Sequence, residues 1–114
     1  MLTTDDVARY LGLLDGVAHA RPGGHDRWTY HGRMVARLVD ETHLAIRTGF
    51  AERDALCEAA PTTFSVPSRM VAHMTVIADL AGGDRAAIEG ALDEAWLLQR
   101  DLDGDRSEPP RGSA

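Results

Sequence analysis

The strongest constraint on the fold of this chain is a period-two alternation of side chains between residues 27 and 47. Large or apolar side chains recur at every second position in three successive runs, which are 28–30, 34–38 and 44–46. This spacing is typical of β-strands, because neighbouring side chains point to opposite faces of a sheet. Gly32 and the segment Asp40-Glu41-Thr42 separate the runs, and turns this short join antiparallel strands. We therefore expect a three-stranded antiparallel meander.

Amphipathic segments before and after this meander predict three helices. They span residues 3–14, about 48–60 and about 84–100. In the first, Thr3 and Asp6 occupy the two positions of a capping box ahead of apolar residues at helical spacing. Pro61 ends the second helix.

Two more strands are expected between the second and third helices, at 64–66 and 70–80. Residues 17–25 contain Pro22 and two glycines and therefore predict a loop. The predicted order is helix, three strands, helix, two strands and helix. Strands that form hairpins, with helices packed against them, indicate an α+β fold.

The prediction is a single domain over residues 1–100 and a polar tail over residues 101–114. The domain is expected to hold an antiparallel sheet of about five strands with N-terminal, middle and C-terminal helices. The tail is polar and rich in Pro, Gly and Ser, a composition typical of mobile segments.

Composition and charge limit where such a protein works. The chain has 114 residues, a net charge of −6 and one cysteine, Cys57. A lone thiol forms no internal disulfide, which fits a reducing compartment. The N-terminus carries Asp5 and Asp6 where a secretory signal is positively charged, and no apolar run reaches the length of a membrane span. We therefore expect a cytoplasmic protein without membrane contact, and the sequence leaves its oligomeric state open.

Several short motifs follow one another in a fixed order. They are Leu13-Leu14-Asp15-Gly16-Val17, Trp28-Thr-Tyr-His-Gly-Arg-Met-Val-Ala-Arg-Leu38, a late strand around Met74-Thr75-Val76, and Leu92-Asp-Glu-Ala-Trp-Leu-Leu98. In order and spacing, over about residues 3 to 100, the chain resembles the MmcQ/YjbR family. That family carries "LPGV"-like, "F-x-V-x-G-K-x-F-A-x-L" and "I-x-x-A-W-x-L" segments at these places.

The resemblance implies a fold similar to double-wing DNA-binding domains. Separately, all twelve basic residues are arginine, lysine and asparagine are absent and alanine is frequent, which is typical of a GC-rich bacterial genome. The family takes half its name from a mitomycin-resistance gene cluster, which implies a second role near small toxic molecules. This chain departs from the family pattern at two points. The His-Trp pair that many members carry in the late strand is His73-Met74 here, and the chain has no lysine.

Charge is unevenly distributed along the chain. Residues 17–47 carry +2, from five arginines against three acidic residues, whereas residues 84–105 carry −5. Alternate residues share one face of a sheet, so hairpin arginines can line one surface and contact phosphates. The candidate nucleic-acid-binding residues are Arg27, Arg33, Arg37, Arg47 and Arg69. The alternative is that these arginines pair with the acidic helices or only keep the surface solvated.

The sequence contains no motif for catalysis, metal binding or cofactor binding. It has no Gly-x-Ser-x-Gly elbow and no glycine-rich phosphate loop. Its five histidines lack the i, i+4 spacing of a zinc-binding helix and have no partner cysteines. Cys57 lies among acidic residues, which disfavour a reactive thiolate. We expect a non-enzymatic protein that uses no metal and no cofactor.

The large side chains support an alternative function. Most are expected in the core, but a set of them can also line a pocket for a small planar molecule. This set is Trp28, Tyr30, His73, Met74 and Trp96. The sequence thus supports two hypotheses, a DNA-binding module that uses the hairpin arginines and a protein that binds or sequesters a small molecule.

Overall fold

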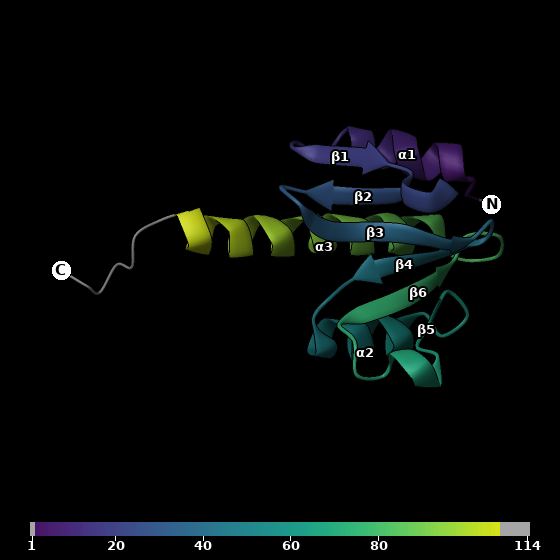
Figure 1. The fold of residues 1–114 in the computed structure, drawn as a ribbon. Helices are drawn as coiled ribbons and strands as arrows, with labels where there is room; N and C mark the ends of the chain where they lie inside the picture. The colour runs from purple at the N-terminus through teal and green to yellow at the C-terminus, as the bar shows by residue number, and fades with distance from the viewer. Residues whose placement is uncertain (1, 108–114) are drawn as a thin grey trace.

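The alternating segment forms the centre of a six-stranded sheet in the computed structural model, which describes residues 2–107 (Figure 1). In spatial order the strands are β1 (Val17–Ala20), β2 (Arg27–Tyr30), β3 (Arg33–Asp40), β4 (His43–Arg47), β6 (Thr75–Asp79) and β5 (Phe64–Ser65). Every neighbouring pair is antiparallel. The predicted meander is therefore confirmed as β2, β3 and β4.

Helices pack at three places around this sheet. Over the described residues they are α1 (Thr4–Gly12), α2 (Phe50–Ala59) and α3 (Arg85–Ser107), with two short 3-10 helices, η1 (Pro22–Gly24) and η2 (Ser68–Met70). Helix α3 lies across β2, β3 and β4, α1 lies beside β1, and α2 contacts β5 and β6 (Figure 1). This arrangement confirms the predicted α+β fold with N-terminal, middle and C-terminal helices.

The start of α1 has the predicted capping box. The Thr3 hydroxyl accepts a hydrogen bond from the Asp6 backbone N–H at 3.1 Å, and the Asp6 carboxylate accepts one from the Thr3 backbone N–H at 3.0 Å. These two bonds satisfy backbone donors that a helix start otherwise leaves unpaired. Further along α1, the Tyr10 hydroxyl donates a 2.7 Å hydrogen bond to Asp93 and so links α1 to α3.

The main core lies between α3 and one face of the sheet. Trp28, Ala36, Ile46 and Val76 form a row of paired positions across four strands, and all four are buried. Side chains of α3 cover this row: Ile88, Ala91, Leu92 and Ala95. Apolar burial on this face is the main stabilising contribution to the fold.

The segment expected to be a loop at 17–25 contains a strand instead. Residues 17–20 pair with β2 in register, from Val17 opposite Tyr30 to Ala20 opposite Arg27. Three of their four side chains are exposed, so the segment shows no apolar alternation. Its strand conformation comes from backbone pairing, and local pattern alone does not reveal this.

Element ends also differ from the prediction. Helix α1 ends at Gly12, and the late strand forms only at Thr75–Asp79, because η2 and a turn precede it. Helix α3 continues beyond Arg100 to Ser107, where no proline interrupts it. Part of the expected tail is therefore helical, and residues 108–114 lie outside the described residues. Among the described helices, none combines the length and apolar character that a membrane span requires.

Candidate functional site

The sheet has a second face that points away from α3. Arg27 lies opposite Arg37 in the β2–β3 pair, Arg37 lies opposite Ala45, and Ala45 lies opposite Ile77. Since side chains alternate along a strand, this row points to the side opposite the Trp28 row. We call this side the open face, because α1 and α3 pack against the other side (Figure 1).

A small apolar cluster covers one part of the open face. Met70, from η2, packs with Ala45 and Ile77, and all three are buried. Val39 and Val66 lie against them and are partly buried. The cluster brings η2 onto the open face, next to β4, which is far from it in sequence.

Two hollows lie on the open face, and Arg37 lines both. The first measures about 360 Å³ and is lined by Met34, Arg37, Arg47, Arg69, Met70, His73 and Thr75. The second measures about 260 Å³ and is lined by Pro22, His25, Asp26, Arg27, Arg37, Leu38 and Val39. Four of the five arginines predicted from the sequence are thus gathered on one face.

These four arginines, Arg27, Arg37, Arg47 and Arg69, have no carboxylate partner within the described residues. Other arginines of the chain do form ion pairs, at 3.8 Å between Arg9 and Asp6, 3.4 Å between Arg21 and Asp26, and 3.2 Å between Arg85 and Glu89. The alternative in which the hairpin arginines pair with acidic helices is therefore not observed in this part of the chain. Arg27 and Arg37 are also directly opposed, and like charges in that position destabilise a sheet.

The fifth predicted arginine, Arg33, lies elsewhere. It pairs with Tyr30, which packs against the main core on the α3 side. Plain alternation would place Arg33 and Arg37 on one face. A β-bulge shifts the register between Trp28 and Thr29 and buries both Val35 and Ala36. One extra residue in a strand moves everything before it to the opposite face.

The residues predicted for a small-molecule pocket are divided between the two faces of the sheet. Trp28 is 1% exposed in the core and stacks on His19, with ring centroids 4.7 Å apart. Tyr30 stacks on His31 at 4.0 Å. Both aromatic rings lie on the α3 side of the sheet, against the main core.

The other members of that set are also separated. The Trp96 indole N–H donates a 2.8 Å hydrogen bond to the Asp15 carbonyl, and the Arg100 guanidinium lies 4.6 Å from the centre of its ring. His73 lines the first hollow of the open face, whereas the neighbouring Met74 does not. Of these five residues, only His73 belongs to the open face.

A histidine–aspartate contact at the β1–β2 connection was not predicted. His19 Nε2 lies 2.7 Å from Asp26 Oδ1, and Arg21 Nε lies 3.4 Å from the same oxygen. Asp26 is buried, and the group borders a hollow of about 740 Å³ beside α1. The sequence gives no motif for it, because the partners come from a strand and a connection seven positions apart. These contacts join β1 to the connection that leads into β2. Among the described residues, no group of histidine, cysteine, aspartate and glutamate side chains could hold a metal ion.

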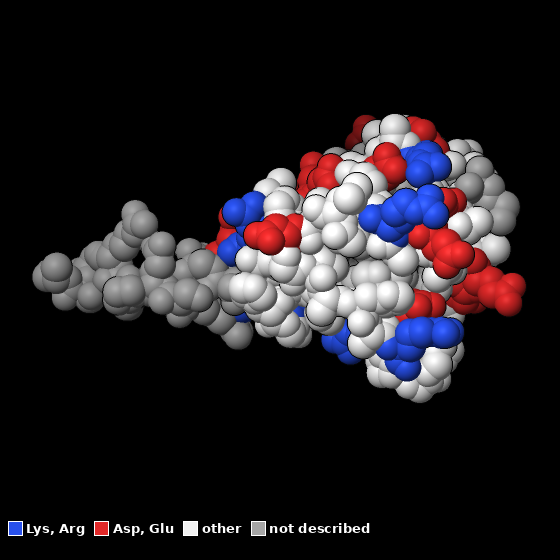
Figure 2. Space-filling model, turned by 90° about the horizontal axis from the view of Figure 1, so that it is seen from above, with Lys and Arg blue, Asp and Glu red and all other residues white. Residues whose placement is uncertain are grey.

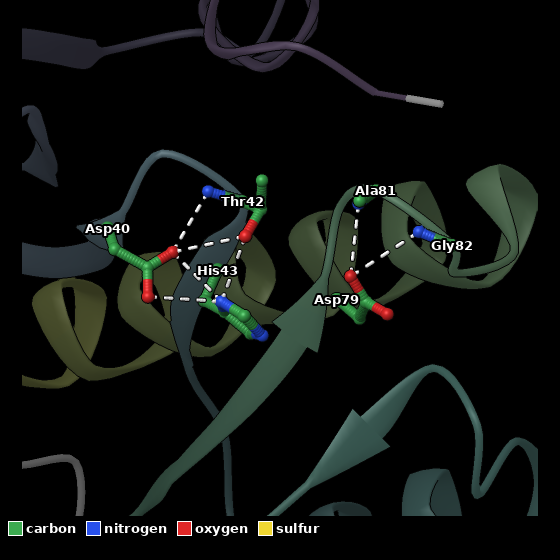
Figure 3. A network of polar contacts seen from close by, with 6 residues as sticks. All are labelled: Asp40, Thr42, His43, Asp79, Ala81 and Gly82. Carbon is green, nitrogen blue, oxygen red and sulfur yellow. Dashed lines mark hydrogen bonds and ion pairs between the residues drawn. The ribbon is translucent and has the colours of Figure 1, made fainter.

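Two carboxylates at one end of the sheet hold turns (Figure 3). Asp40 accepts a 2.9 Å hydrogen bond from the Thr42 backbone N–H and lies 2.8 Å from His43 Nδ1. The Thr42 backbone hydrogen bond, with His43 adding to it, holds the pKa of the Asp40 carboxyl below its usual value. Asp79 accepts hydrogen bonds from the Ala81 and Gly82 backbone N–H groups. These acidic groups are therefore used in turns.

The single thiol is not activated. Burial raises the pKa of Cys57, the nearby Arg53 partly opposes this effect, and Asp54 adds to it. A thiol whose pKa is raised remains protonated and is a poor nucleophile at neutral pH. Cys57 packs beside the main core, as expected for a small apolar residue.

Charges of both signs are mixed over other parts of the surface. Figure 2 shows the side that carries α1 and β1, where blue arginine groups and red acidic groups lie next to one another without a continuous basic area. Comparison with models of known families, with curated proteins and with solved structures found no match to this chain. The chemistry of the open face is therefore the basis for a functional proposal.

Proposed function

We propose that the protein is a non-enzymatic binding protein that contacts the phosphates of nucleic acid through its open face. The observation that carries this proposal is the first hollow, where Arg37, Arg47 and Arg69 converge without a carboxylate partner among the described residues. An arginine that folding leaves without a partner remains available to a ligand. Guanidinium groups match phosphate oxygens with two parallel hydrogen bonds.

The net charge of −6 lowers the affinity that we expect for nucleic acid. An acidic protein repels a polyanion at long range, so attraction must come from local contacts on the open face. If Arg27, Arg37, Arg47 and Arg69 each neutralise one phosphate, the logarithm of the duplex binding constant should fall with the logarithm of salt concentration at a slope of about 3 to 4. We expect weak binding with this moderate salt dependence.

The resemblance to the MmcQ/YjbR family supports the same proposal, because that family resembles double-wing DNA-binding domains. As part of the proposal, we assign the protein to this family, to a bacterium and to the cytoplasm. The cytoplasmic location is supported by the single, unpaired Cys57.

Fluorescence anisotropy of a labelled generic duplex tests the proposal. We expect binding at about 50 mM salt that weakens at about 200 mM with a slope of about 3 to 4. The double substitution Arg37→Glu with Arg47→Glu should abolish it. The double substitution Arg85→Glu with Arg100→Glu changes the net charge equally on α3, on the other side of the sheet, and should weaken binding only slightly. Equal losses in both variants, or no binding of the native protein at low salt, would refute the proposed interface.

A further inference from the structure

We infer that the open face prefers single-stranded nucleic acid to duplex, with an unstacked base held in the first hollow. This inference rests on the proposed function and names the class of ligand that the same face selects. The lining of that hollow and its size carry the inference.

The two hollows form a track across the sheet. Arg27 and Arg37 line one hollow, and Arg37 lines the next together with Arg47 and Arg69. A flexible single strand can follow such a row with successive phosphates. Binding of single strands commonly combines a positively charged groove along the backbone with surfaces on which bases stack.

The first hollow offers more than charge. Met34 and Met70 contribute apolar, polarisable side chains to its lining, and His73 contributes a flat ring. Bases that are free of a partner strand stack on rings and on guanidinium planes. The volume of about 360 Å³ lies at the small end of the range for small-molecule sites, which suits one base.

A duplex can use only part of this site. Its bases are stacked inside the helix, so its phosphates can reach Arg37 or Arg47 but its bases cannot reach Met34 or His73. Reading a major groove requires an inserted helix or ribbon. Among the described residues, α1 and α3 pack on the other side of the sheet, η2 contributes Met70 to the apolar cluster on the open face, and α2 bonds the wall of the hollow through its buried Arg53.

One wall of the hollow is fixed before a ligand arrives. The Arg53 side chain is buried and donates hydrogen bonds of 2.9 Å to the Val71 carbonyl and 2.8 Å to the His73 carbonyl. These bonds hold the segment between η2 and β6, which carries His73, against α2. A wall fixed in advance lowers the entropy cost of binding.

The test compares a labelled 12-nucleotide single strand with the duplex of the same sequence, by anisotropy at low salt. We expect the single strand to bind about tenfold more tightly, since each stacked base contributes measurably to affinity. Met34→Ala and His73→Ala should each reduce single-strand affinity several-fold and leave duplex affinity unchanged. Met74→Ala, a matched methionine that does not line the hollow, should change neither. An oligo-glutamate peptide of equal charge serves as competitor.

The outcomes separate the two proposals. Equal binding of strand and duplex, with both lost in the Arg37→Glu, Arg47→Glu variant, would overturn the preference for single strands and leave the phosphate interface standing. Tighter binding of the duplex than of the single strand would also overturn the preference for single strands and leave the phosphate interface standing. Equal competition by oligo-glutamate would overturn base recognition and point to an acidic protein partner. No binding of either nucleic acid would overturn the proposed function together with the inference.

Discussion

The two faces of the sheet are built from the same strands and differ in almost every property. On the α3 side, the row of Trp28, Ala36 and Ile46 is buried beneath a helix. On the open face, Arg27 lies directly opposite Arg37, with no carboxylate partner in the described part of the chain. Alternate positions of β2 and β3 therefore differ: Trp28 and Ala36 are buried in the core, whereas Arg27 and Arg37 carry charge on the open face.

The largest expected contrast between the faces is at β2. Trp28→Ala removes a side chain that is 1% exposed and should lower the free energy of unfolding by about 3 to 5 kcal/mol. Arg27→Ala, at the adjacent position on the open face, should change it by less than about 0.5 kcal/mol. Urea denaturation followed by circular dichroism measures both, and similar losses in the two variants would break the distinction between the faces.

Unlike the arginines of the open face, Arg53 is buried. Its removal should lower the free energy of unfolding by an intermediate amount. Arg53→Ala removes hydrogen bonds to the Val71 and His73 carbonyls and leaves both without these donors. We expect the free energy of unfolding to fall by about 1 to 3 kcal/mol. Amide hydrogen exchange should also become faster at residues 71–73. Unchanged exchange there would show that Arg53 does not hold this segment.

The hydrogen bond between Tyr10 of α1 and Asp93 of α3 can be tested at alkaline pH. Burial, together with the hydrogen bond to Asp93, raises the pKa of Tyr10 to about 12. The neutral hydroxyl therefore contributes stability in full below pH 10, its usual pKa, and this contribution is lost as pH rises through about 12. Tyr10→Phe should cost about 0.5 to 1.5 kcal/mol at pH 8. The same comparison at pH 11 should give a smaller cost, whereas a constant difference would contradict the assigned contact.

The smallest expected effect on stability is at Arg37. Arg37→Thr removes one of two like charges in a directly opposed pair, so the free energy of unfolding should stay the same or rise by about 0.2 to 0.5 kcal/mol. Affinity for nucleic acid should fall in the same variant. A loss of stability measured by urea denaturation would show that Arg37 has a structural role instead.

Much of this fold was predictable because burial imposes a period on the sequence. The meander of β2, β3 and β4 follows from alternation, and the capping box at Thr3 and Asp6 marks the start of α1. Strand β1 was missed because its exposed side chains carry no apolar pattern. The element that local pattern reveals least is the one held mainly by backbone pairing.

The candidate site was predictable in part for the same reason. Arg27 and Arg37 share a face through paired strands, as alternation predicts. Arg33 was placed wrongly with them, because a bulge is not visible in the spacing of side chains. The contact between His19 and Asp26 depends on how β1 folds back on β2, which no short motif encodes.

The most direct test of the open face is to observe its arginines individually during binding. In a 114-residue protein with twelve basic residues, all arginine, the side-chain Nε–Hε signals can be assigned by NMR. On titration with a short single strand, we predict shifts at Arg37, Arg47 and Arg69 and none at Arg9 or Arg85. Shifts confined to the helix arginines, or no shift at any arginine at low salt, would contradict the account.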